Sequence, residues 1–460
     1  MSLTKASYSM VAGAPVNVLD YGADPTGVAD SQPAIVAAIA AAGYRGKVFI
    51  PAGVYSISSS ISLSTGTAVS RPVEIYGAGI ATQIVNNAPA NNPCFNFSKV
   101  ANWYIHDLLL SGNTTHPNDG LWGVGAGTFT FTIERLTLMM PGYGIKLSDA
   151  NTGSISNCVS WPTFINASPV PSVQPITTSL IKTHIYLTGS FINDLSVSNC
   201  VLQPSVNYAA NARGIRLDAS NSNSLSIANC DVESYSGSVL QTEIGIELIN
   251  ANNFVLQNIY NEKTQVVLDN CYDGTVNGVS DGGSLGVFSL KSNSVRNNIS
   301  NIYQDYMIVG LDATCNQNMF VASTIRNSYS DIAVPPNVYI GCQTLTRSGN
   351  TPRGLTSIVE LTASAGVYTP DSAVSTTMFL RPSSSAFTIA APLNGIKGAI
   401  ITITIQNGSG GALGAATWNA IYRMSAWTNP ANGYNRSVTF QYDPDYGWRQ
   451  ISQTGVDVLN

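Results

Sequence analysis

Two short apolar patterns alternate through the middle of this chain and repeat many times. The first has an aliphatic residue, two small or polar residues and then another apolar residue, and its eight copies begin at Ile105, Ile133, Ile155, Val197, Ile227, Leu256, Val276 and Ile299. The second lies between copies of the first, at residues 144–147, 184–187, 214–217, 245–248, 265–268 and 287–290. A period of mostly 20–30 residues is typical of a solenoid, in which each repeat buries its apolar face against its neighbours.

The two patterns alternate in the way that short β-strands do, so the predicted solenoid is built of strands. Leucine-rich repeats would need a fixed leucine pattern and helical repeats a 3.6-residue period, and neither is present. We therefore predict an all-β fold, a single-stranded parallel β-helix in which equivalent residues of successive coils stack about 4.8 Å apart.

The third and fourth positions of the first pattern carry recurring residue types. The third is often Asn, which suits a bend with positive φ, as at Asn157, Asn199 and Asn229. Cysteines follow Asn at Cys158, Cys200, Cys230 and Cys271. The chain has seven Cys without a CxxC or metal-ligand spacing, so we predict buried free thiols.

The segment before the repeats predicts one helix. Asp30 or Ser31 can cap its start, Pro33 suits its first turn and Gly43 its C-terminal cap. The helix has almost no polar face, so we expect it to be covered on most sides, for instance across the end of the strand stack. We assign residues 1–15 to a lead or attachment segment, 16–60 to an N-terminal cap and 61–333 to the β-helix.

Residues 161–182 interrupt the repeats with four Pro and predict a protruding loop. The pattern fades after about residue 331, and residues 334–353 read as a linker. The remaining part, 354–460, has strands separated by Gly, Asn and Pro turns, typical of an antiparallel β-sandwich.

Composition excludes some partners. Only 10% of residues are charged, with 21 basic and 26 acidic residues and no Lys/Arg cluster, so nucleic acid is not an expected partner. No apolar run reaches the length of a membrane span, and the first residues lack the apolar core of a secretory leader. We expect no membrane insertion.

A small group of acids offers catalytic chemistry. After the bend at Asn229, Asp231 and Glu233 point outward, and one coil later Tyr260 and Glu262 do the same. The alignment stacks Asp231 beside Tyr260 and Glu233 beside Glu262, which gives the paired carboxyl groups that glycoside hydrolysis needs. Crowded like charges raise the pKa of one acid, as a general acid requires. The alternative is a group of solvated acids with Lys263 as the neutralising residue.

Arg216 and Glu247 align in the second pattern, with Asp218 on the same face. An ion pair between coils is one interpretation; in the other, Asp218 is a second acid and Arg216 binds a uronate carboxylate. Elimination would instead need a base such as Lys263, Arg216 or a Tyr. No calcium-loop spacing is present, and we expect neither a metal nor another cofactor.

Aromatic side chains are candidate stacking platforms for sugar rings, with ordinary burial as the alternative. The candidates are Trp122 and Trp161 with Tyr208, Tyr235 and Tyr260. The scattered histidines are expected to be structural or on the surface: His106, His116 and His184.

Residues 17–55 resemble the start of the pectate-lyase-like β-helix superfamily, to which bacteriophage tailspikes belong. The resemblance lies in Asp-Tyr-Gly-Ala at 20–23, Gly-Val-Ala-Asp-Ser at 27–31 and Phe-Ile-Pro-Ala-Gly-Val-Tyr at 49–55. Residues 3–15 look like the short lead of tailspike and tail-fibre subunits.

The resemblance implies a right-handed β-helix with an N-terminal capping helix, three chains side by side in a homotrimer, and a C-terminal β-domain. It further implies attachment to a phage tail or baseplate through the N-terminus, a place in the virion tail, and action at the host cell surface. No family catalytic motif is present to carry over.

The function expected from the resemblance and the acids together is a tailspike. It would recognise a bacterial surface polysaccharide, namely capsule, O-antigen or exopolysaccharide, and depolymerise it by glycosidic hydrolysis. The alternatives are a non-catalytic receptor-binding tail protein and a lyase acting on a uronate-containing polymer.

Overall fold

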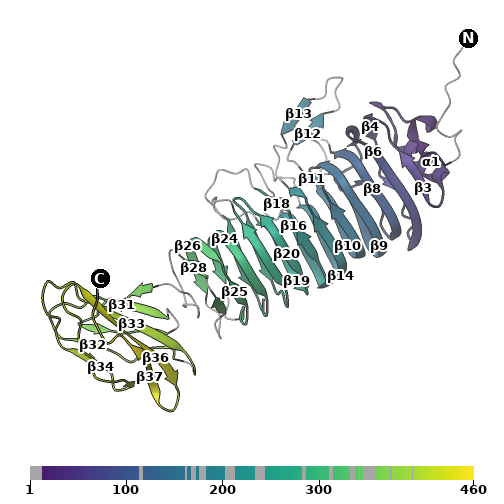
Figure 1. The fold of residues 1–460 in the computed structure, drawn as a ribbon. Coiled ribbons are helices and arrows are strands. Elements are labelled where there is room, and N and C mark those ends of the chain that lie inside the picture. Colours follow the sequence, from purple (N-terminus) through teal and green to yellow (C-terminus); the bar gives the residue numbers. More distant parts are fainter. Residues whose placement is uncertain are drawn as a thin grey trace, which may run out of the picture. The chain divides into compact units, whose positions relative to one another are not determined.

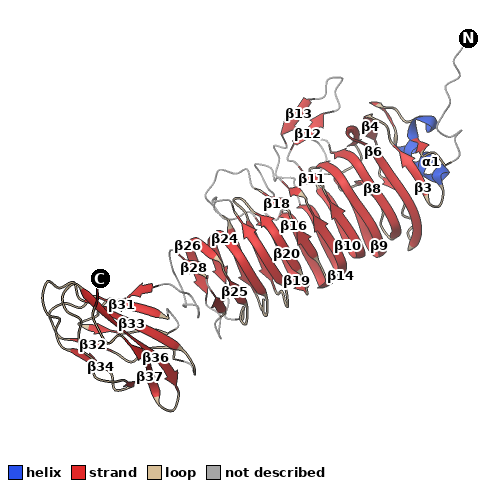
Figure 2. Ribbon diagram, viewed as in Figure 1, coloured by secondary structure: helices blue, strands red, loops and turns tan. Residues whose placement is uncertain are grey.

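The computed structural model describes residues 13–112, 118–160, 163–166, 172–175, 183–202, 213–233, 244–281, 286–309, 314–331, 337–340, 342–344, 358–372, 376–395 and 397–459. The chain forms two compact units, the first of Met1–Asn298 with Ile302–Ile308, and the second of Ile299–Asn301 with Val309–Asn460. Strands dominate both units, and the one α-helix among the described residues is α1 (Gln32–Ala42) (Figures 1 and 2). The all-β class is as predicted.

The strands of the first unit range from the 2 residues of β1 to the 21 residues of β9 and follow one another around successive coils. The first coils contain β1 (Val16–Asn17), β2 (Thr26–Asp30), β3 (Gly46–Phe49), β4 (Gly53–Ile57), β5 (Ile61–Ser62), β6 (Val69–Asn86), β7 (Pro93–Asn96) and β8 (Val100–Ser111). The middle coils contain β9 (Asp119–Met139), β10 (Tyr143–Ser156), β11 (Val159–Ser160), β14 (Thr183–Ser198) and β15 (Val201–Leu202). The later coils contain β16 (Arg213–Asn223), β17 (Ser226–Ala228), β18 (Asp231–Val232), β19 (Ile244–Asn252), β20 (Val255–Tyr260), β21 (Gln265–Asp269), β22 (Thr275–Ser280) and β23 (Val287–Lys291).

Each strand of these coils pairs in parallel with its counterpart one coil away. In β10, for example, Ile145 pairs with Leu121 of β9 on one side and with Ile185 of β14 on the other. All three side chains are fully buried, whereas Lys146, the next residue of β10, is only partly buried. Alternation along the strand and stacking between strands therefore build one continuous interior of apolar columns. Figure 1 shows the strands of successive coils side by side.

The bends of the first pattern adopt the left-handed backbone conformation that the sequence predicts. The third residue of all eight copies has a positive φ between 50° and 76°, at Asp107, Arg135, Asn157, Asn199, Asn229, Asn258, Gly278 and Asn301. The backbone N–H of the bend residue donates to the next coil, as from Asn199 to the Ala228 carbonyl at 3.0 Å. Each bend thus turns the chain and ties two coils together.

The cysteines lie inside the stack. All seven are free and buried, as predicted. Burial raises the pKa of the Cys271 thiol to about 12, which keeps it protonated and unreactive.

Helix α1 begins after Ser31, and the Asp30 carboxylate accepts a hydrogen bond from the Gln32 N–H at 3.0 Å. The helix packs against β1, β3, β5 and the 3₁₀ turn η2 (Val18–Tyr21) through Ile35 and Ile39, both almost fully buried. The expectation of cover on most sides is wrong, because Ala37, Ala40 and Ala41 are exposed. Alanine exposes little apolar surface while favouring the helix.

The interruption at 161–182 contains an antiparallel hairpin of β12 (Thr163–Asn166) and β13 (Ser172–Pro175), which pair with each other in a sheet of their own (Figure 1). Trp161 and the tyrosines Tyr208 and Tyr235 lie outside the described residues, as do His116 and most of the predicted lead and linker.

The second unit begins with strands that still pair in parallel, β25 (Met319–Val321) with β27 (Val338–Ile340) and β26 (Thr324–Asp331) with β28 (Gln343–Thr344). β24 (Asn298–Val309) has residues in both units. Two further sheets follow. One contains β29 (Ile358–Glu360), β31 (Thr377–Leu380), β33 (Ile400–Gln406), β35 (Tyr422–Arg423), β36 (Tyr434–Asp443), β37 (Gly447–Gln453) and β38 (Val458–Leu459); the other contains β30 (Val367–Tyr368), β32 (Phe387–Ile389) and β34 (Ala416–Trp418).

Both of these sheets contribute to one core, in which Ile389, Ile403 and Trp448 are fully buried. The antiparallel pattern expected here is only partly right. β33, β36 and β37 are antiparallel, but β29, β31 and β33 are parallel to one another, and so are β30, β32 and β34. The chain alternates between the two sheets from β29 to β34, and strands reached by such crossovers run parallel.

Asn199 is a suitable position for testing the bend conformation, because its side chain is exposed and its φ is 53°. We predict that Asn199→Val lowers the free energy of unfolding by about 1–2 kcal/mol, because a β-branched residue is strained at this φ. Denaturant unfolding followed by circular dichroism measures the change. Asn199→Gly is the matched control and should stay close to the parent, and an equal loss in both variants would contradict the role of positive φ.

Candidate functional site

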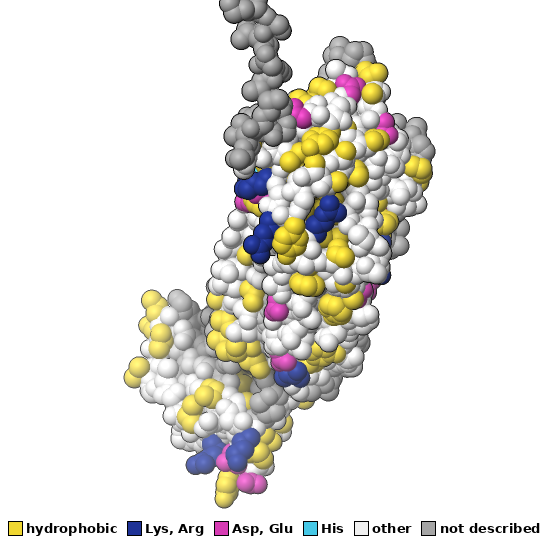
Figure 3. All heavy atoms as spheres, turned by 90° about the vertical axis from the view of Figure 1, so that its right-hand side faces the viewer, with side chains coloured by type: hydrophobic (Ala, Val, Ile, Leu, Met, Phe, Trp, Pro, Cys, Tyr) yellow, Lys and Arg dark blue, Asp and Glu magenta, His cyan; other side chains and the backbone are white. Residues whose placement is uncertain are grey.

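Charged side chains are sparse on the surface. Figure 3 shows a face on which they appear as isolated spots among uncharged polar groups and apolar patches. Among the described residues, no group of three or more His, Cys, Asp or Glu is placed to hold a metal ion. The places where charged groups gather therefore stand out as candidate sites.

The first is an acidic cluster that we define as Asp231, Glu233, Tyr260, Glu262 and Lys263. Asp231 of β18 pairs in register with Tyr260 at the end of β20, the stacking that the alignment expects. The Tyr260 hydroxyl donates to Glu262 Oε2 at 3.0 Å, and Lys263 Nζ lies 3.5 Å from Glu262 Oε1. The structure thus brings together the three predicted acids, the phenol and the neutralising lysine.

The turn that carries Glu262 is held from inside the coil. Asn261 is fully buried, donates to the Thr264 carbonyl at 3.1 Å, and accepts a 2.8 Å hydrogen bond from Gln304. Lys263 has a φ of 57°, so the turn is tight. These contacts fix the backbone on both sides of Glu262 and orient its carboxylate toward Tyr260.

Asp231 has the most perturbed carboxyl group of the cluster. Its Oδ1 atom is buried and has no hydrogen-bond partner. Burial, then the charge of Glu233 and a hydrogen bond to it, and finally the charge of Glu262 raise the pKa of Asp231 to about 6. A carboxyl group that keeps its proton to about pH 6 can act as a general acid near neutral pH.

The phenol of Tyr260 also has a raised pKa. Burial, and after it the hydrogen bond to Glu262 and the charges of Glu262, Glu233 and Asp231, raise the pKa of Tyr260 to about 12. Tyr260 therefore remains a hydrogen-bond donor at neutral pH and is poorly suited to remove a proton.

The second group centres on Glu247 of β19, which is nearly buried. Arg216 of β16 pairs with it in register, and Glu247 Oε2 lies 3.3 Å from Arg216 Nε and 3.0 Å from Arg213 Nε. Arg216 Nη2 also lies 2.9 Å from Asp218 Oδ2. This is the ion-pair arrangement, and it leaves Asp218 engaged rather than available as a second acid.

Trp122 of β9 is partly buried, and its indole Nε1 donates to the buried Asp119 Oδ2 at 2.8 Å. The Lys146 ammonium lies 5.1 Å from the centre of the Trp122 ring, within the range of a cation–π contact. Sequence reasoning singled out Trp122 but not Lys146.

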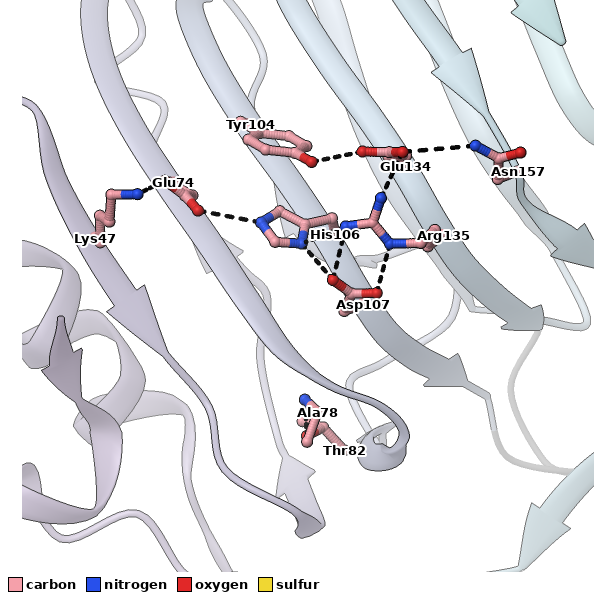
Figure 4. A network of polar contacts seen from close by, with 10 residues as sticks. All are labelled: Lys47, Glu74, Ala78, Thr82, Tyr104, His106, Asp107, Glu134, Arg135 and Asn157. Carbon is pink, nitrogen blue, oxygen red and sulfur yellow. Dashed lines mark hydrogen bonds and ion pairs between the residues drawn. The ribbon is translucent and has the colours of Figure 1, made fainter.

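A third group of charged residues surrounds His106 (Figure 4). It was not predicted from the sequence as a site, and His106 was expected to be structural or on the surface. His106 of β8 contacts Asp107 at 2.6 Å through Nδ1 and Glu74 at 3.2 Å through Nε2. Its ring stacks between those of Tyr76 and Tyr104. His184, in contrast, is buried and hydrogen-bonded to Ser160, and burial lowers its pKa to about 4.

Arg135 completes the group in Figure 4 by binding Asp107 and Glu134, and the Tyr104 hydroxyl donates to Glu134 at 2.5 Å. Hydrogen bonds from Arg135 hold the pKa of Asp107 at about 2. Lys47 pairs with Glu74 at 2.7 Å. Each charge faces one of opposite sign, so this network stabilises the stacking of the first coils.

A comparison with known families finds a match in the N-terminal part of the chain. Residues 15–92 match the family described as rhamnogalacturonase A/epimerase, pectate lyase-like. We call these residues, which are similar to that family, the pectate-lyase-like segment. The match includes residues 17–55, so the resemblance noted in the sequence is confirmed. The pectate-lyase-like segment ends before the coils that carry the acidic cluster.

Solved structures that match the chain include ORF18 of Geobacillus virus E2, at 12% identity and a TM-score of 0.46, covering 97% of this chain and 76% of that one. The A-module of the Azotobacter vinelandii mannuronan C-5 epimerase AlgE4 has 18% identity and a TM-score of 0.38, with coverages of 74% and 98%. A Pseudomonas phage tailspike has 11% identity and a TM-score of 0.39, with coverages of 88% and 80%. No curated protein sequence matches the chain.

No helix among the described residues is long and apolar enough to cross a membrane.

The raised pKa of Asp231 predicts how stability depends on pH. A carboxyl with a pKa of about 6 when folded and 3.8 otherwise binds its proton more tightly in the folded protein, so its contribution is complete below about pH 4. That contribution is lost as the pH rises toward 6. We expect Asp231→Asn to reduce this loss and to raise the unfolding midpoint at pH 7 relative to the parent.

Chemical denaturation at pH 4, 5, 6 and 7 measures the effect. Asp273→Asn is the control, because Asp273 is paired with Arg296 and its pKa is lowered by that hydrogen bond. A parent and an Asp231→Asn variant with the same pH dependence would show that Asp231 titrates normally.

Proposed function

We propose that this protein binds a bacterial surface polysaccharide and depolymerises it by glycosidic hydrolysis at the acidic cluster. The observation that carries the proposal is a half-buried carboxyl with a pKa of about 6, Asp231, beside two further carboxyl groups, Glu233 and Glu262. Hydrolysis of a glycosidic bond needs a protonated acid and a carboxylate close together.

In the proposed reaction Asp231 donates its proton to the glycosidic oxygen as the bond to the leaving sugar breaks. Glu262, which accepts from Tyr260 and pairs with Lys263, is the candidate nucleophile or base. Glu233 keeps the proton on Asp231, because the hydrogen bond between their carboxyl groups exists only while one of them is protonated.

Elimination by a lyase is the second candidate, and the site supports it less well. The high pKa of Tyr260 opposes its use as a base, and Lys263 is engaged with Glu262. Arg216, the other candidate base and a uronate ligand, is engaged with Asp218 and Glu247. A non-catalytic receptor-binding protein would use the same surface without cleaving the polymer.

We further infer that the protein is a phage tailspike, a homotrimer in the virion tail that acts at the host cell surface and attaches to the tail or baseplate through residues 1–15. The parallel coils would form a right-handed β-helix over residues 61–333, with α1 as its N-terminal cap. Residues 334–353 would link it to a C-terminal β-sandwich for trimerisation or carbohydrate binding. The pectate-lyase-like segment and the parallel register support this assignment.

Removing the acids tests the reaction. We predict that Asp231→Asn, Glu233→Gln and Glu262→Gln each lower the rate of polysaccharide shortening at least about 100-fold, the usual contribution of an acid–base group. Product size is followed by size-exclusion chromatography on purified capsular and O-antigen polysaccharides. The parent rate should fall as the pH rises above about 6, where Asp231 loses its proton.

The control variant is Asp273→Asn, which removes an exposed ion pair with Arg296 and should cleave at the parent rate. An unsaturated product absorbing in the ultraviolet would favour the lyase, and binding without shortening would favour the non-catalytic protein. Parent rates in all three acid variants would refute the site.

A further inference from the structure

One column of outward-facing residues crosses the coils at the third position of the second pattern. Register pairs join Trp122 of β9 to Lys146 of β10, Lys146 to Tyr186 of β14, Tyr186 to Arg216 of β16, and Arg216 to Glu247 of β19. The residues on either side of each member point inward and are buried, as Ile145 and Leu147 do around Lys146. We call these five residues with Tyr143 the axial ladder.

The rings and cations of the ladder touch from coil to coil. Lys146 Nζ lies 5.1 Å from the ring centres of both Trp122 and Tyr143. The rings of Tyr143 and Tyr186 stack at 5.1 Å with an angle of 19°, and the Arg216 guanidinium lies 5.8 Å from the Tyr186 ring. These ring and cation contacts are therefore continuous over four coils, and the ion pair of Arg216 with Glu247 extends the ladder to a fifth.

A buried carboxylate fixes one end of the ladder. Asp119, which is fully buried, accepts from the Trp122 indole through Oδ2 and from the Tyr143 backbone N–H through Oδ1, both at 2.8 Å. The two aromatic groups that flank Lys146 are thus held by the same side chain, so the Lys146 ammonium is positioned before any ligand arrives.

The two cations of the ladder differ in charge balance. Arg216 is paired with Asp218 and Glu247. Lys146 has no carboxylate within ion-pair distance among the residues that the structure describes; its contacts are the two aromatic rings. A positive charge between aromatic surfaces, without a counter-ion from the described chain, is suited to a ligand that combines a sugar ring with an anionic group.

The acidic cluster lies on the coils that follow the ladder, and the turn that joins β20 to β21 carries Glu262 and Lys263. The accessible part of the column ends before that turn, because Glu247 is buried and its register partner Val267 of β21 is fully buried. A polymer lying along the part of the ladder from Trp122 to Arg216 would run across the strands, with about one coil every 4.8 Å.

We propose that the axial ladder binds an acidic polysaccharide along the coil stack, and that Lys146 selects for its carboxylate groups. This inference rests on the proposed function for the role of the acidic cluster, but binding by the ladder does not require cleavage. It adds Lys146, Tyr143 and Tyr186 to the substrate-contacting residues and names the substrate class as carboxylate-bearing.

Affinity electrophoresis of the full chain tests the proposal, in gels containing polygalacturonate, alginate or hyaluronate and in gels with the carboxyl-reduced form of each. We expect at least one acidic polymer to retard the protein and its reduced form to retard it at least tenfold more weakly, judged by the polymer concentration for half-maximal retardation. Lys146→Met should weaken retardation tenfold or more, while Lys146→Arg keeps most of it. Added salt should weaken binding of the parent more than binding of Lys146→Met.

Lys47→Met is the matched control, since it removes a lysine that is paired with Glu74 on the first coils. It should bind like the parent, and thermal unfolding checks that every variant is folded. The proposal is overturned if none of the three acidic polymers retards the parent, if reduced polymers retard it equally, or if Lys146→Met binds like the parent. Asp231→Asn should still bind, so the two proposals can fail separately. Binding of a polymer without cleavage would count against the acidic cluster and not against the ladder. Cleavage without retardation would count against the ladder and not against the acidic cluster.

Discussion

Parallel pairing in register between successive coils is the constraint on which the solenoid of this protein depends. It brings each residue within about 4.8 Å of its equivalent one coil away, so every choice of side chain is repeated in space. Apolar residues then form continuous columns, as Ile145, Leu121 and Ile185 do. The bends repeat too, and the bend residues Asn157, Asn199 and Asn229 each donate a backbone N–H to the next coil.

The same constraint explains the scarcity of charge. An exposed charge repeated in every coil would form a column of repelling groups, and a chain with only 10% charged residues avoids this. In the network of the first coils, opposite charges face each other, because Glu74 pairs with Lys47 and both Asp107 and Glu134 pair with Arg135. The acidic cluster departs from this rule, because Asp231 faces acids on two sides and is the carboxyl group whose pKa rises to about 6.

Sequence alone could predict the coils and much of the acidic cluster, because both follow from the repeat. Aligning Asn229 with Asn258 places Asp231 beside Tyr260, and the structure has that register. The same procedure, applied to the third position of the second pattern, would have joined Trp122, Lys146 and Tyr186 to Arg216. Trp122 and Arg216 were instead considered separately, because residues 120–123, which pair with the copy at 144–147, were not recognised as a copy of the second pattern.

Other features could not be predicted from the repeat. The contact of Arg213 with Glu247 and the burial of one oxygen of Asp231 depend on side-chain conformations that no spacing encodes. In the second unit, short strands with Gly and Asn turns suit parallel and antiparallel pairing equally well. Only the alternation between two sheets made the strands from β29 to β34 parallel.

Because its cysteines are buried and unpaired, the fold of this protein does not depend on the redox state of its surroundings. All seven thiols are unpaired and enclosed by the stack, so no covalent cross-link has to form during folding and none can be reduced afterwards. Noncovalent contacts alone maintain the coils. A chain of this kind keeps the same native state in reducing and in oxidising surroundings.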